Sequence, residues 1–118
     1  MYFLLLLTLN DIEMDSGGPV VDPYDEQNPC IKCFRLENNW DDAELFYDDI
    51  DEIDKRCNAL LDYGDVDWFD ASQCAKLLKW IDDRLQRPAV PRYVELLSVL
   101  RDLCEKAVNL NTGVMIDL

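Results

Sequence analysis

The chain has 118 residues, a formal net charge of −14 from 25 acidic and 11 basic residues, and no histidine. Its hydrophobic content of 49% predicts one folded domain over residues 1–118, with a modest core. Such a negative charge argues against direct binding to a nucleic-acid backbone or to an anionic membrane surface, since both select basic patches. A basic protein partner is allowed, although the charge alone is also a common means of keeping a small protein in solution.

Five cysteines are spread along the chain: Cys30, Cys33, Cys57, Cys74 and Cys104. An odd number without a secretion signal indicates a reducing compartment, so we expect a cytoplasmic protein. Cys30 and Cys33 have the spacing of half a zinc site. A structural zinc site needs four ligands, and the sequence supplies neither a second such pair nor a histidine. We therefore expect no metal and no other cofactor.

The N-terminal third predicts two strands joined by a long loop. Residues 1–9 are a continuous apolar run, too short to span a bilayer, and the length favours a buried strand over a short buried helix. Residues 10–28 are rich in Asp, Gly and Pro and predict a loop, within which Val20 and Val21 could form a short pairing segment. Residues 30–36 alternate in part, and we expect them to pair with the first strand in antiparallel fashion.

Residues 40–61 predict a helix with one apolar face and one negative face, because apolar residues recur at steps of three and four. The apolar stripe consists of Phe46, Ile50, Ile53, Cys57, Leu60 and Leu61. The opposite stripe consists of Asp41, Glu44, Asp48 and Asp51, flanked by Asp49 and Glu52. Trp40 stands at the start of this stretch, just before the first acidic residue, and Tyr47 lies between the stripes. Aromatic rings beside carboxylates are typical of protein-binding hot spots, so we expect all eight of these polar and aromatic residues to contact a partner.

The C-terminal half predicts two further helices and a last strand. Residues 63–69 are expected to be a loop, after which Asp70 and Gln73 form the capping box of a helix that runs to about residue 86. A third helix, residues 91–110, begins at a proline and is apolar over a wide arc, so it should be the central one. Asn111 or Gly113 can supply the left-handed turn that ends this helix.

Residues 114–118 complete the pattern as a strand. The resulting order predicts an α+β fold, in which three helices pack on one face of a small sheet of about three strands.

Residues 74–118 combine a leucine-rich helix pair, a proline break and a closing apolar strand after Thr112 and Gly113. In these features the segment resembles small acidic bacterial proteins, among them immunity-type proteins of toxin systems. The resemblance implies a cytoplasmic inhibitor of a cognate toxin, often a basic nuclease. It assigns no role to any single residue.

The pattern of charges therefore predicts a non-enzymatic protein that docks its acidic face on a basic partner, as an immunity protein or a nucleic-acid mimic does. The lack of histidine removes the commonest acid–base residue and argues against an enzyme. Two alternatives remain open. One is a carboxylate site for a divalent metal, with hydrolytic activity, and the other is a structural or adaptor domain that self-associates through the edge of its N-terminal strand.

Overall fold

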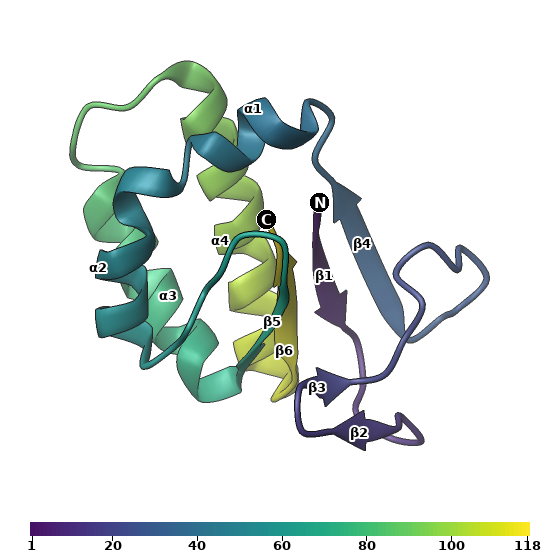
Figure 1. Cartoon of the computed structure of the whole chain (residues 1–118). Coiled ribbons are helices and arrows are strands. Elements are labelled where there is room, and N and C mark those ends of the chain that lie inside the picture. The colour runs from purple at the N-terminus through teal and green to yellow at the C-terminus, as the bar shows by residue number, and fades with distance from the viewer.

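A four-stranded antiparallel sheet, in the order β4-β1-β6-β5, forms the centre of the computed structural model, which describes all residues from 1 to 118. Its strands are β1 (Tyr2–Leu6), β4 (Ile31–Arg35), β5 (Val66–Asp70) and β6 (Gly113–Asp117). Helices α3 (Ala71–Arg84) and α4 (Pro91–Leu110) lie on one face of the sheet, with α4 against β1 and β6 (Figure 1). The α+β class is confirmed, but the sheet has four strands and not about three. None of the helices is both long and apolar enough to cross a membrane.

Strand β1 is interior because it is apolar on both faces, and all five of its residues are buried. Phe3 and Leu5 belong to the main core beneath the helices, whereas Leu4 and Leu6 belong to a smaller cluster on the opposite face. Because β1 lies between β4 and β6, it offers no free edge. The expectation that the N-terminal strand is an edge strand is therefore wrong.

A small hairpin, β2 (Met14–Asp15) and β3 (Gly18–Pro19), lies beside β5. The short pairing segment expected at Val20 and Val21 thus forms slightly earlier in the chain. Glycine is required at two places where the backbone meets Trp68. A Cβ atom at Gly18 would lie 2.7 Å from the Trp68 Cβ, and one at Gly113 would collide with the far edge of the indole ring. Trp68 is consequently held between the hairpin and β6.

The helix predicted over residues 40–61 is wrong as a single element. The chain forms α1 (Asn39–Glu44), the 3₁₀ turn η1 (Tyr47–Asp49) and α2 (Ile50–Cys57). α1 packs against α4 and α2 packs against α3, so the chain turns between the two helices (Figure 1). α2 ends at Asn58, whose φ of 53° is left-handed, and Leu60 is 80% exposed rather than part of the apolar stripe.

The loop predicted for residues 63–69 is also wrong in part, because it contains most of β5. This edge strand alternates aspartates with apolar residues and is only partly buried, so its local pattern is weak. The capping box that follows is confirmed, with the Gln73 N–H donating to Asp70 at 2.9 Å. α3 ends at Arg84, two residues before the predicted end near residue 86. α4 has the predicted bounds and is terminated by Asn111, which has a left-handed backbone conformation.

Candidate functional site

The eight acidic residues between positions 41 and 54 divide into two sets with different surroundings. One set has partners inside the protein and consists of Asp42, Asp49, Glu52 and Asp54. The other set is exposed, forms no ion pair, and consists of Asp41, Glu44, Asp48 and Asp51. The second set contains the four residues of the acidic stripe predicted from the sequence. All four are exposed, although the single helix predicted to carry them is divided into α1, η1 and α2.

Asp42 holds α1 against α4 through a bidentate ion pair. Its carboxylate is 1% exposed and accepts hydrogen bonds from Arg92 Nε at 2.9 Å and from Arg92 Nη2 at 2.8 Å. The backbone N–H of Asn38 also donates to it, at 3.1 Å. The Arg92 hydrogen bonds lower the pKa of Asp42 to about 2, against the opposing effect of burial. A carboxylate engaged in this way is a structural element and is not available to a partner.

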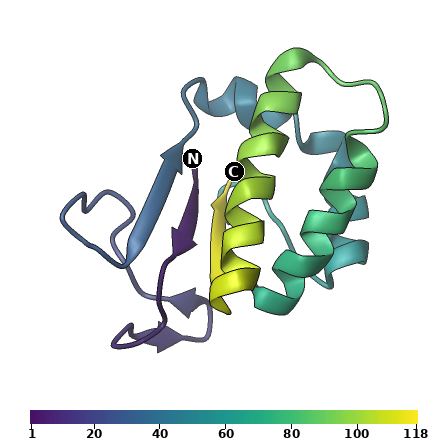
Figure 2. The same ribbon diagram turned by 180° about the vertical axis from the view of Figure 1, so that it is seen from behind.

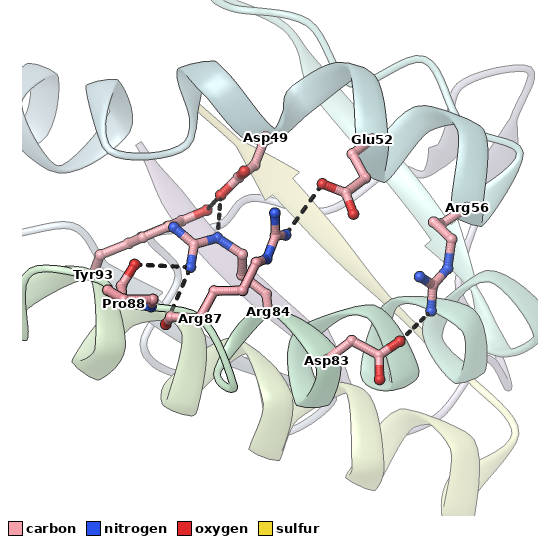
Figure 3. Close-up of polar contacts among 8 residues, drawn as sticks. All are labelled: Asp49, Glu52, Arg56, Asp83, Arg84, Arg87, Pro88 and Tyr93. Carbon is pink, nitrogen blue, oxygen red and sulfur yellow. Dashed lines mark hydrogen bonds and ion pairs between the residues drawn. The ribbon is translucent and has the colours of Figure 1, made fainter.

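Asp49 lies at the junction of η1, α3 and α4 (Figure 3). It is 8% exposed, and it accepts hydrogen bonds from Arg84 Nε at 2.9 Å and from the Tyr93 hydroxyl at 2.6 Å. Burial, followed by the adjacent Asp49 carboxylate, raises the pKa of Tyr93. Arg84 also donates to the carbonyl oxygen of Pro88 at 3.3 Å, which fixes the connection between α3 and α4. The expectation that Asp49 belongs to the exposed face is therefore wrong.

Glu52 is half-buried and pairs with Arg87 at 3.2 Å, on the side of α2 that faces α3 (Figure 3). Arg56 pairs with Asp83 at 2.8 Å in the same row. Both pairs are largely exposed, so each contributes at most about 1 kcal/mol. Glu52 thus lies at the border of the acidic stripe, with its charge already partly compensated.

The exposed stripe is accompanied by the two aromatic residues expected from the sequence. Trp40 is 63% exposed and Tyr47 is 52% exposed. The Tyr47 ring stacks on Tyr63, with centroids 3.9 Å apart and planes inclined by 22°. Burial, and then the neighbouring Tyr47 and Glu44, raise the pKa of Tyr63. Tyr63 therefore supports the aromatic part of the face, a role that the sequence did not indicate because the residue lies in a loop.

We call this set of six residues the acidic face: Trp40, Asp41, Glu44, Tyr47, Asp48 and Asp51. Negative charge continues beyond it through Asp62 and Asp65 in the loop before β5 and through Asp67 in β5. Burial is the main cause that raises the pKa of Asp67, and the surrounding carboxylates add to it. The local potential is therefore more negative than a single helix would produce.

No group of three or more His, Cys, Asp or Glu side chains is arranged so that it could hold a metal ion. All five cysteines are free thiols, with Cys30 and Cys33 partly buried and the other three buried. Comparisons of the chain with protein-family models, with curated proteins and with solved structures found no match. The chemistry of the acidic face is consequently the basis for a functional interpretation.

Proposed function

We propose that this chain is a non-enzymatic binding protein that uses the acidic face to neutralise a basic protein partner. The observation that carries the proposal is that four exposed carboxylates, Asp41, Glu44, Asp48 and Asp51, have no counterion in the protein. All six arginines are engaged elsewhere, five in ion pairs and Arg35 over the ring of Tyr24. Within this stretch, ion pairs thus neutralise the two buried carboxylates, Asp42 and Asp49, and leave these four available to an external cation.

The arrangement suits a partner with a basic cleft. Carboxylates repeated along α1, η1 and α2 can occupy positions that phosphates would take in such a cleft, and the large negative charge would speed capture. Trp40 and Tyr47 supply apolar area that can be desolvated between the charges, and aromatic residues in such positions dominate binding energy. A toxin such as a nuclease fits this description, which agrees with the immunity-type resemblance of residues 74–118.

The proposal is tested by isolating a partner and measuring its association rate. The protein is used as bait in a lysate of its source cells at low and at high salt, and the captured basic protein is purified. Its association rate with the wild type should fall steeply as salt rises, because exposed charges are screened within about 10 Å at 0.1 M salt.

The decisive variant is Asp48→Lys, with Glu13→Lys as a control of equal charge change at an exposed residue in the hairpin region. Asp48→Lys should lower the association rate by about tenfold or more, whereas Glu13→Lys should have a much smaller effect. Binding that responds neither to salt nor to Asp48→Lys would refute the proposal.

A further inference from the structure

β4 is an edge strand with one row of free backbone groups. It pairs only with β1, whereas the other edge strand, β5, is contacted by β3. The N–H of Leu36 donates to the carbonyl oxygen of Met1, and hydrogen-bonded pairs alternate along an antiparallel ladder. By this alternation Phe34 and Lys32 direct their backbone groups toward β1. The residues that direct theirs outward are Ile31, Cys33 and Arg35.

Three hollows border this edge, on both faces of the sheet. On the helix side, one of about 480 Å³ and one of about 210 Å³ lie between β4 and α4, and both are lined by Phe34 and Val99. On the opposite side, one of about 250 Å³ lies between β4 and the loop that contains Asp25 and Glu26. In Figures 1 and 2, β4 is the outermost strand of the sheet, and the loop between β3 and β4 projects beyond it in both views. α4 covers β1 and β6 rather than β4. The free edge therefore has room for side chains on either side.

One of these three hollows has an excess of positive charge, unlike the protein as a whole. Lys32 and Lys106 line the 210 Å³ hollow, and neither forms an ion pair. The nearby positive charge of Lys106 lowers the pKa of Lys32. Asp102 is the only carboxylate that lines the same hollow. Its charge acts on Lys32 in the opposite direction to that of Lys106 but does not outweigh it, because the pKa of Lys32 remains lowered. An incoming carboxylate would relieve their repulsion.

We propose that β4 accepts an extended segment of a partner protein as an additional antiparallel strand. The backbone of that segment would bond to the outward N–H and C=O groups of Ile31, Cys33 and Arg35. Its alternate side chains would enter the hollow on the helix side, with an apolar residue against Phe34 and a carboxylate between Lys32 and Lys106. In such strand addition the main-chain bonds supply affinity and the pockets supply specificity.

A second copy of the chain fits this edge less well than a partner strand. Antiparallel pairing of two β4 strands would bring the Lys32 and Lys106 pairs of both copies to one side of the sheet, where they repel each other. Each copy also carries a net charge of −14. The edge is separate from the acidic face, so the proposal does not depend on the function proposed above.

The test uses the full chain labelled with ¹⁵N and the probe peptide acetyl-Thr-Val-Thr-Glu-Thr-amide. In antiparallel pairing, the valine of the probe would face Phe34 and its glutamate would face Lys32. Titration followed by ¹H–¹⁵N correlation spectra should shift the amides of Ile31, Cys33 and Arg35 most, because these groups gain hydrogen bonds. A probe with lysine in place of glutamate should bind more weakly.

Two pairs of variants separate the contribution of the lysine charges to probe binding from that of the β4 backbone hydrogen bonds. Lys32→Gln with Lys106→Gln should weaken binding of the probe by about three- to tenfold, the range of two exposed ion pairs. The matched control, Lys55→Gln with Lys79→Gln, removes two exposed lysines that form no ion pair and should leave affinity unchanged.

The two variants that test the backbone hydrogen bonds are both at Cys33. Cys33→Pro removes an outward N–H without removing a bond to β1 and should abolish binding, whereas Cys33→Ser should retain it. Spectra of the free variants show whether each is folded.

Two results would overturn the proposal. If the probe shifts none of the β4 amides in the folded wild type, the lysines protect the edge from pairing, as charged residues on edge strands often do. If the same amides shift with protein concentration in the absence of the probe, a second copy occupies the edge and not a partner strand. Asp48→Lys should leave binding of the probe intact, which separates this proposal from that of the acidic face.

Discussion

Replacing Asp42 by asparagine should destabilise the protein by about 2 kcal/mol at pH 7. The Arg92 ion pair lowers the pKa of Asp42 from its ordinary value of 3.8 to about 2. Since a pKa change of one corresponds to about 1.4 kcal/mol, this lowering amounts to about 2 kcal/mol of stability when the carboxyl is charged. The side chain is buried, so solvent does not screen the interaction as it would at the surface.

The effect depends on pH in a defined direction. Because the pKa is lower in the folded state, the stabilisation is fully present above about pH 4 and is lost as the pH falls from about 4 to about 2. The difference in free energy of unfolding between the wild type and Asp42→Asn should therefore shrink over this interval. Urea denaturation followed by tryptophan fluorescence, at several pH values, measures it.

Asp41→Asn is the matched control for this experiment. Asp41 is the adjacent residue, carries the same charge and is exposed without an ion-pair partner, so its replacement should change stability by less than about 0.5 kcal/mol. Equal losses in the two variants, or a loss in Asp42→Asn that does not vary between pH 4 and pH 2, would refute the division of the acidic residues into structural and free sets.

Three further predictions concern the core and its borders. Tyr93→Phe removes a hydrogen bond of 2.6 Å to the buried Asp49 and should cost about 1–3 kcal/mol in urea denaturation. Gly113→Ala places a methyl group against the Trp68 ring and should cost about 1–3 kcal/mol, as overpacking does; an unchanged melting temperature would contradict this. Burial raises the pKa of Cys57 to about 11, so iodoacetamide at pH 8 should label this thiol, by mass spectrometry, only after unfolding.

The free acidic residues were predictable from periodicity. Residues that lie opposite an apolar stripe at 100° per residue point away from the core, and Asp41, Glu44, Asp48 and Asp51 do so even though a 3₁₀ turn interrupts the helix. The burial of Asp49 and its hydrogen bonds inside the protein were not predictable from the sequence. Its partners Arg84 and Tyr93 come 35 and 44 residues later in the chain, and nothing local to Asp49 indicates them.

The β4 edge likewise combines features that the local sequence predicts with features that only the whole fold sets. The strand itself follows from its local alternation, and its pairing with β1 was expected. Whether a second strand covers its other side depends on the order of all strands in the sheet. The hollows beside it depend in addition on where α4 crosses the sheet and on the path of the loop around Asp25.

The sequence by itself determined those features that short-range signals encode. The apolar run of β1, the capping box of α3, and the proline and left-handed asparagine that bound α4 each act within a few residues, so their effects survive in any tertiary context. Only the tertiary structure decided the order of the strands, the turn between α1 and α2, the existence of β5, and which carboxylates are neutralised inside the protein. These outcomes depend on contacts between distant segments, because a buried charge requires a partner whose position the whole fold sets.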